Sequence, residues 1–108
     1  MTELVTVEIN CPDLASATAI AEAVLARRLA ACANIGAPVT SLYTWEGKAE
    51  RATEVTVFLK TRAALFEPLA ALARRLHPYD LPCVIAHPVS HATADYRAWV
   101  LAETEGGV

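Results

Sequence analysis

Residues 31–60 show the clearest alternation of hydrophobic and polar positions in the chain, and they predict a long β-hairpin. A glycine-centred turn at residues 46–48 joins two arms that are rich in β-branched and aromatic residues. Gly36-Ala37-Pro38 interrupts the first arm. A bulge or bend there would let the two halves of the arm belong to two different sheets. Because strands usually run about 5–6 residues, arms of this length extend beyond a small core. We therefore expect a second copy of the chain to cover the outer ends of the hairpin.

The remaining periodicities predict two further strands and three helices. Residues 3–10 alternate, and residues 83–89 form a short apolar run that ends near a proline. Helical spacing begins after Asp13 or Ser16, either of which can cap a helix by accepting hydrogen bonds from its free amides. The apolar positions of this first helix are Ala17, Ile20, Ala21, Val24 and Leu25, followed by Arg27 and Arg28.

The second helix contains a proline within its apolar stripe. Thr61 could cap this helix, and its stripe consists of Leu65, Leu69, Leu72, Ala73 and Leu76. Because Pro68 removes one helical hydrogen bond, we expect either a kink or a helix that begins near Leu65. The loop that follows, residues 77–82, is expected to be rigid because it contains two prolines.

The last helix is expected to start near Thr93 or Ala94, and residues 105–108 after it are expected to fray. One side of this helix carries Tyr96, Trp99 and Val100. The complete order is then strand, helix, strand, strand, helix, strand, helix. Right-handed crossovers around a central antiparallel pair turn this order into an α+β, ferredoxin-like split-βαβ sandwich with one extra helix.

Length, hydrophobic content, charge and cysteine count limit the number of domains, the partners and the location that we expect. The 108 residues fit one domain over 1–108, and the 55% of hydrophobic residues exceed what a lone small domain needs, which favours subunit contacts. The net charge is −3 and no run of Lys and Arg occurs, which argues against nucleic acid or membrane as a partner. With no apolar run near about 18 residues and no signal-peptide pattern, we expect a cytoplasmic protein. Three cysteines are an odd number, which disfavours a disulfide framework.

Five short motifs occur in one order along the chain. They are Ala31-Cys32-Ala33-Asn34-Ile35, Thr40-Ser41-Leu42-Tyr43-Thr44-Trp45-Glu46-Gly47-Lys48, Lys60-Thr61, His77-Pro78-Tyr79 and Asp95-Tyr96-Arg97-Ala98-Trp99. Together they closely resemble the CutA divalent-cation-tolerance family over roughly residues 5–102. The resemblance implies a ferredoxin-like protomer, a homotrimer held by strand pairing between subunits, and a link to tolerance of copper and other divalent metals.

Two positions depart from the family pattern. Pro82 is followed by Cys83 where the family has Glu, and His91-Ala92-Thr93 stands where the family often has Gly. A carboxylate is therefore replaced by a thiol at an expected pocket wall.

Candidate metal ligands are Cys32, His77 and Cys83, with Cys11 as a weaker candidate on a surface loop. Thiolates suit Cu(I) or Zn(II), so the expected cofactor is copper, as Cu(I) or Cu(II), or another divalent cation, with no organic cofactor. Each candidate has a structural alternative. A free cysteine often packs as a small hydrophobe, and His77 could instead be a cation at a helix C-terminus.

The aromatic residues of the motifs suggest a second kind of site. Tyr and Trp usually need a hydrogen-bond partner when buried, and the candidates for an inter-subunit cleft are Tyr43, Trp45, Lys60, Tyr79, Tyr96 and Trp99. The alternative interpretation is an aromatic interface between the three subunits.

No catalytic set is recognisable in the sequence. It contains no Gly-rich phosphate loop, no nucleophile elbow and no Cys-His-Asp arrangement with family spacing, so we do not expect an enzyme. The sequence favours a trimeric metal-tolerance protein that binds metal ions. The alternatives are a small-molecule-sensing signalling trimer, which the short 46–48 turn disfavours, and a structural trimer that positions a partner protein.

Overall fold

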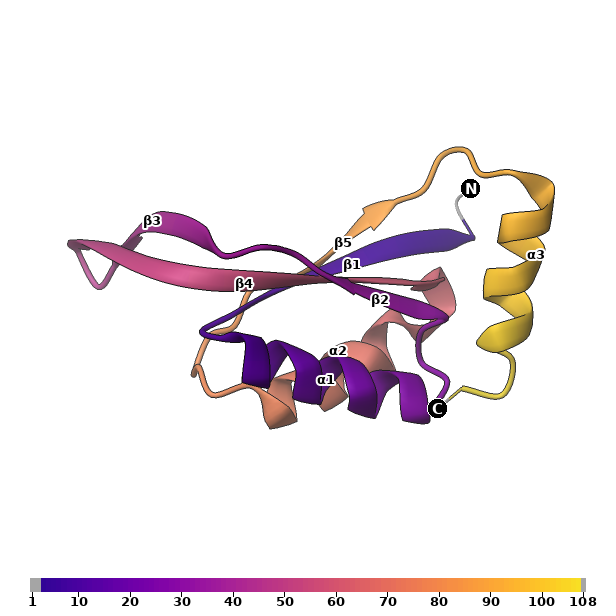
Figure 1. The fold of residues 1–108 in the computed structure, drawn as a ribbon, viewed down its shortest axis with the longest axis horizontal. Helices are drawn as coiled ribbons and strands as arrows, with labels where there is room; N and C mark the ends of the chain where they lie inside the picture. The colour runs from indigo at the N-terminus through magenta and orange to yellow at the C-terminus, as the bar shows by residue number, and fades with distance from the viewer. Residues whose placement is uncertain (1–2, 108) are drawn as a thin grey trace.

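An antiparallel sheet with two helices on one face forms the body of the molecule, and a long hairpin projects from it (Figure 1). The computed structural model describes residues 3–107. The elements in chain order are β1 (Leu4–Cys11), α1 (Leu14–Ala26), β2 (Cys32–Ile35), β3 (Val39–Trp45), β4 (Lys48–Arg62), a 3₁₀ turn (Ala63–Leu65), α2 (Phe66–Leu76), β5 (Val84–Pro88) and α3 (Ala94–Glu103). The strand order β2-β4-β1-β5, with β3 added beside β4, confirms the ferredoxin-like split-βαβ arrangement.

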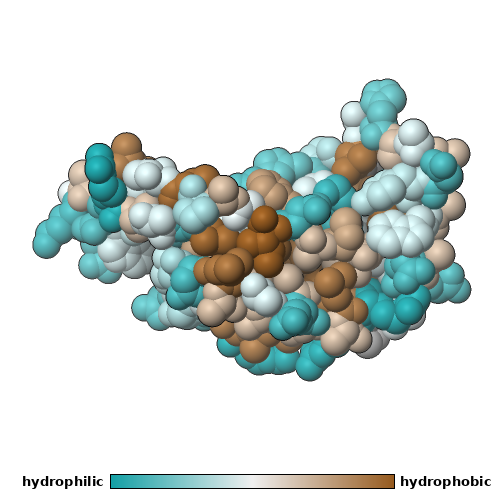
Figure 2. Space-filling model, viewed as in Figure 1, coloured by the Kyte–Doolittle hydropathy of each residue, from teal (hydrophilic) through white to brown (hydrophobic). Residues whose placement is uncertain are grey.

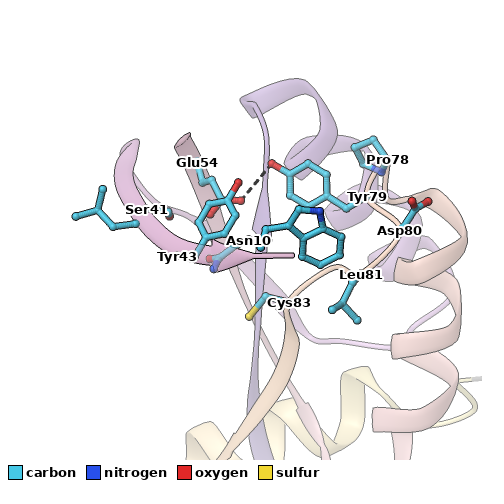
Figure 3. A pocket seen from close by; sticks show the side chains of 11 residues that line it. Asn10, Ser41, Tyr43, Glu54, Pro78, Tyr79, Asp80, Leu81 and Cys83 are labelled. Carbon is cyan, nitrogen blue, oxygen red and sulfur yellow. Dashed lines mark hydrogen bonds between the residues drawn. The ribbon is translucent and has the colours of Figure 1, made fainter. Parts of the chain in front are cut away.

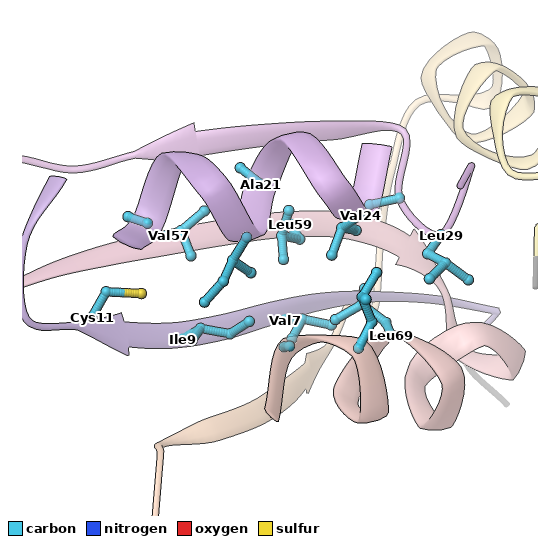
Figure 4. Close-up of a cluster of buried hydrophobic side chains, with 14 of the residues drawn as sticks. Val7, Ile9, Cys11, Ala21, Val24, Leu29, Val57, Leu59 and Leu69 are labelled. Atoms are coloured by element: carbon cyan, nitrogen blue, oxygen red, sulfur yellow. The ribbon is translucent and has the colours of Figure 1, made fainter. Parts of the chain in front are cut away.

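The core lies between the sheet and helices α1 and α2 (Figure 4). Every second residue of β1 points into it, and each one pairs with an inward residue of β4, as in Val7↔Leu59 and Ile9↔Val57. Directly opposite residues of an antiparallel pair share one face, so this register gives the helices a continuous apolar surface. The helices contribute the fully buried Ala17, Ile20, Val24, Leu69 and Ala73.

The hairpin has the interrupted first arm that the sequence predicts. Strands β2 and β3 are separated by residues 36–38, and both pair with the single 15-residue strand β4. At the tip, Glu46 and Gly47 both have positive φ angles, 51° and 81°, as a two-residue type I′ turn requires. The projecting arm makes the molecule elongated, with extents of 44 × 25 × 23 Å.

The N-cap residue expected from the sequence is observed for α1 but not for α2. Asp13 caps α1 as expected, and its Oδ1 accepts a hydrogen bond of 2.8 Å from the Ser16 amide. Thr61 does not cap α2, because it is a fully buried residue of β4. Helix α2 begins at Phe66 after the 3₁₀ turn, so Pro68 falls in the first turn, where a helical amide has no partner to lose.

Residues 105–107 are anchored, so the expected fraying is wrong for this segment; Val108 lies outside the described residues. The Arg28 guanidinium donates to the carbonyl oxygens of Glu105 and Ala102 at 3.1 and 3.0 Å. A Cβ at Gly107 would collide with the Arg28 carbonyl, so the chain end passes close against the α1 terminus. The Arg28 guanidinium therefore lies at the C-terminal end of α3, although Arg28 itself follows the end of α1 in the chain.

Candidate functional site

A hollow of about 690 Å³ lies between the base of the hairpin and the loop from α2 to β5 (Figure 3). Volumes of this size are typical of small-molecule sites. Three aromatic side chains line it, Tyr43, Trp45 and Tyr79, together with the carboxylates of Glu54 and Asp80.

Three parts of the chain supply the aromatic and acidic side chains of this hollow. Tyr43 and Trp45 are two residues apart on β3 and therefore point to the same face. Glu54 lies on β4 opposite Val39. The rigid loop of residues 77–82 brings Tyr79 and Asp80 to the other wall, where prolines at 78 and 82 restrict the backbone.

Glu54 is the buried charged group of the hollow. Its side chain is only 7% exposed, and its Oε2 accepts a hydrogen bond of 3.2 Å from the Tyr79 hydroxyl (Figure 3). Burial, followed by the Glu54 charge, raises the pKa of Tyr79. The hydroxyl therefore stays protonated at neutral pH and remains a donor to the carboxylate.

His77 holds the loop in place. It is 7% exposed, and its Nε2 lies 2.7 Å from the Asn10 carbonyl oxygen while its Nδ1 accepts from the Tyr79 amide at 3.1 Å. Because a carbonyl can only accept, the ring proton is on Nε2, and the lone pair of Nδ1 is already used. In this arrangement neither ring nitrogen is free for a metal, so the contacts support a structural role for His77 rather than its candidate role as a ligand.

Cys83 is half-buried in the wall of the same hollow. Burial raises the pKa of its thiol, and the charges of Glu8 and Glu54 raise it further. The departure from the family pattern thus places a neutral thiol beside a buried carboxylate at neutral pH.

Cys32 lies away from the hollow, at the start of the edge strand β2. Its Sγ is 3.5 Å from the Tyr96 hydroxyl on α3. This hydrogen bond and partial burial raise the pKa of Tyr96 to about 12. Lys60 pairs with Cys32 in the strand register, and its ammonium donates to Asn34 Oδ1 at 2.8 Å.

The six candidates for an inter-subunit cleft therefore divide between two places. One group of three, Tyr43, Trp45 and Tyr79, lines the large hollow. Lys60 and Tyr96 line a smaller hollow of about 250 Å³ beneath α3. The Trp99 ring lies beside that of Tyr96 in a tilted arrangement, with ring centroids 5.6 Å apart. A single chain does not bring them together, and a cleft between subunits stays a prediction.

Cys11 is placed differently from the expectation of a surface loop. It is the last residue of β1, pairs with Val55 and is fully buried in the core (Figure 4). Burial, then the charges of Asp13 and Glu54, raise the pKa of its thiol to about 11. Within residues 3–107, no group of three or more His, Cys, Asp and Glu side chains is placed to hold a metal ion.

Sequence reasoning missed Glu54 and Asp80 as residues of a site. Glu54 alternates with apolar neighbours on β4 and looks like an ordinary solvated charge in the sequence. Its burial arises because the 77–82 loop folds over it, which is a tertiary contact between residues 25 positions apart. The two prolines of that loop were the available signal that it is fixed in position.

The sheet order, the projecting hairpin and the terminal helix define a ferredoxin-like α+β domain with an extended hairpin. The chain belongs to the CutA1 divalent ion tolerance protein family, which matches residues 5–103.

Individual relatives agree with this assignment. A divalent-cation tolerance protein CutA from Citrobacter koseri is 42% identical over 100 residues, which are 93% of this chain and 87% of the relative. Protein CutA from Mus musculus is 41% identical over 97 residues, 90% of this chain and 55% of the relative. The chain thus spans about half the length of the mouse protein and most of the bacterial one.

Solved structures also match over nearly the whole chain. The periplasmic divalent cation tolerance protein CutA from Archaeoglobus fulgidus has a TM-score of 0.91 and 34% identity, covering 94% of this chain and 98% of that one. CutA from Xylella fastidiosa has a TM-score of 0.91 and 34% identity, covering 95% and 99%. Among the described residues, no helix has the length and apolarity to cross a membrane.

Proposed function

We propose that this chain acts in divalent-metal tolerance as a homotrimer that binds copper, or another divalent cation, through cysteine thiols. Membership of the CutA1 family supports the link to metal tolerance. The observation that carries the proposal is the position of Cys32, a partly exposed thiol on the edge strand β2. An edge strand presents unpaired backbone groups to another chain, so ligands from a second subunit would meet this thiol.

The exposed apolar side chains of the projecting hairpin favour association of several copies of the chain. Its outer side chains include Leu42, which is 69% exposed, and Val39, Tyr43 and Trp45, which are exposed to 42–45%. Figure 2 shows hydrophobic side chains gathered at the base of the projecting arm, with scattered ones along the arm itself. Exposed apolar surface of this kind commonly marks an interface, and obligate interfaces resemble a domain core cut in half.

Copper in the Cu(I) state is the metal that fits best. Thiolate is a soft ligand, and soft ligands select Cu(I) over hard cations. Cys83 is a second candidate, since it is partly exposed in the wall of the large hollow. The buried Cys11 has no such access.

Calorimetric titration of the reduced protein with Cu(I), Cu(II) and Zn(II) tests the proposal. We expect Cys32→Ser to weaken Cu(I) binding about tenfold or more, because a hydroxyl is a far poorer soft ligand. Cys11→Ala is the matched control, which removes a thiol that is fully buried and should leave the affinity unchanged. Equal Cu(I) affinity in wild type and Cys32→Ser would remove Cys32 as the site.

The large hollow favours one alternative, a trimer that senses a small molecule. A structural trimer that positions a partner protein is the third interpretation. The cytoplasmic location and the lack of enzymatic activity stay predictions.

A further inference from the structure

We propose that Glu8 and His87 form half of a binding site for a divalent cation such as Zn(II) or Cu(II), and that copies of the chain share this ion at the open face of the sheet. The site contains no thiol, so it is separate from the proposed Cu(I) site at Cys32. It rests on the proposed trimer, because one chain supplies only two ligands.

Glu8 and His87 lie on the face of the sheet opposite α1 and α2. The β1 residues Val7 and Ile9 belong to the core beneath these helices (Figure 1). Because side chains alternate between the two faces of a strand, Glu8 points to the other face, as Thr6 does. His87 on β5 pairs with Thr6, and directly opposite residues share a face. The imidazole and the carboxylate are therefore neighbours on the open face.

The distance between the two side chains suits a shared metal ion. The Nε2 atom of His87 lies 2.8 Å from the Oε1 atom of Glu8. Zinc binds such nitrogen and oxygen atoms at about 2.0–2.2 Å, so two ligand atoms on one ion lie about 3 Å apart. The Nδ1 atom of His87 has no hydrogen-bond partner within residues 3–107 and can carry the ring proton when Nε2 binds a metal. His77 differs, because both of its ring nitrogens already have partners.

The pair is accessible in one chain and its carboxylate has no permanent counter-charge. The side chains of His87 and Glu8 are 55% and 26% exposed, and ion pairs this exposed stabilise a fold only slightly. Among the described residues, no Lys or Arg forms an ion pair with Glu8. Lys60, which pairs with Thr6, donates to Asn34 instead. An entering cation thus meets a carboxylate that no fixed cation neutralises.

The remaining ligands have to come from other copies of the chain. A firmly held zinc ion usually has four ligands, yet the described part of one chain contains no group of three or more metal-binding side chains. His87 lies on the edge strand β5, two residues from Ile85, which is 44% exposed and belongs to the surface that other copies are expected to cover.

Symmetry supplies those ligands without any further residue type. Each copy in a symmetric oligomer presents the same side chains, so three copies bring three imidazoles and three carboxylates to one ion. Nitrogen and oxygen donors of this kind suit Zn(II), Ni(II) or Cu(II), whereas Cu(I) prefers sulfur. The site therefore selects a different class of ion from the thiol site.

The test uses the Cys32→Ser, Cys83→Ser double variant, which lacks both accessible thiols. Calorimetric titration with Zn(II) gives the affinity and the stoichiometry, and sedimentation gives the mass of the same sample. We expect one Zn(II) ion per three chains. With Cu(II) as the probe, electron paramagnetic resonance should show nitrogen coupling from imidazole.

His87→Gln and Glu8→Gln, each added to this background, remove one ligand per copy. We expect either change to weaken Zn(II) binding about tenfold or more, and His87→Gln to abolish the nitrogen coupling. His91→Gln and Glu22→Gln are the matched controls. His91 is an exposed histidine bonded to Ser90, and Glu22 is an exposed residue of α1, so both controls should bind Zn(II) as the background does.

Four results would overturn the inference. They are no Zn(II) binding in the thiol-free background, one ion per chain, unchanged affinity in His87→Gln, and dissociation of the metal-free His87→Gln protein, which would make the pair an assembly contact. A trimer that binds no Zn(II) contradicts this inference alone, whereas a stable monomer contradicts the proposed assembly as well. The Cu(I) affinity of Cys32→Ser is measured separately, so the two metal proposals fail independently.

Discussion

The three cysteines show how strongly surroundings determine the chemistry of identical side chains. Cys11 is fully buried between the sheet and the helices, Cys83 lies in the wall of a hollow, and Cys32 lies on an edge strand beside Tyr96. Burial raises the pKa of Cys11 to about 11, which makes it an inert core residue. Access to metal ions is thus restricted to Cys32 and Cys83.

Burial of Cys11 predicts a loss of stability at alkaline pH. An unfolded thiol loses its proton near pH 8.5, while the folded one retains it until about pH 11. Between these values the folded state binds more protons, so the free energy of unfolding falls as pH rises, by at most about 1.4 kcal/mol per unit. Denaturant unfolding of the reduced protein from pH 8 to pH 11 measures the slope.

Cys11→Ala provides the comparison for that slope. The variant should be less stable at pH 8 because it leaves a cavity, yet lose less stability on going to pH 11. Parallel pH profiles for the two proteins would show that Cys11 does not titrate as its burial predicts.

Cys83→Glu tests the departure from the family pattern. A carboxylate oxygen is a harder ligand than a thiol, so we expect the variant to bind Zn(II) or Mn(II) more tightly and Cu(I) more weakly. Metal titration and thermal unfolding are measured on the same sample, with Cys83→Gln as an uncharged control of similar shape. If Cys83→Glu lowers the midpoint of unfolding and leaves metal selectivity unchanged, Cys83 only fills an apolar gap behind Pro82.

At the scale of elements, periodicity predicted the order of strands and helices, and tertiary contacts determined where they end. The alternation around Val55, Val57 and Leu59 correctly placed β4 on the core. Thr61 looked like a helix cap, but pairing with Val5 extends β4 through it. The same limit applies to the site, because the metal candidates were named by residue type and the sequence does not show that a loop buries Glu54.

The C-terminal helix illustrates a contact that no sequence pattern revealed. The Arg62 guanidinium donates to the Thr104 hydroxyl at 2.9 Å and to the Leu101 carbonyl oxygen. With Arg28, it brings two cations to the C-terminal end of α3, where carbonyl groups lack helical partners and the dipole favours positive charge.

Removal of this contact should loosen α3. We expect Arg62→Met to lower the free energy of unfolding by about 1–2 kcal/mol and to speed amide hydrogen exchange in α3 more than in α1. Arg27→Met is the control, because Arg27 is exposed and its side chain makes no hydrogen bond or ion pair within residues 3–107. Equal effects of the two substitutions would show that the α3 contact does not stabilise the helix.

At the scale of the whole molecule, the isolated chain leaves large apolar side chains uncovered. They extend from the hairpin, with Leu42 and Trp45, to β5, with Ile85, and to α3, with Trp99. Strands β2 and β3 lie along one edge of the sheet and β5 forms the other, so these strands can pair with other chains. We propose that copies of the same chain cover these surfaces and form a trimer.

Sedimentation equilibrium of the reduced protein at micromolar concentration tests this claim most directly. Leu42→Glu should weaken association, because it places a charge in the expected interface, whereas Leu14→Glu should not, although Leu14 on α1 is comparably exposed at 60%. For the wild type we expect a mass three times that of one chain, stable to dilution through the micromolar range. A wild-type protein that remains a stable monomer at these concentrations would contradict it.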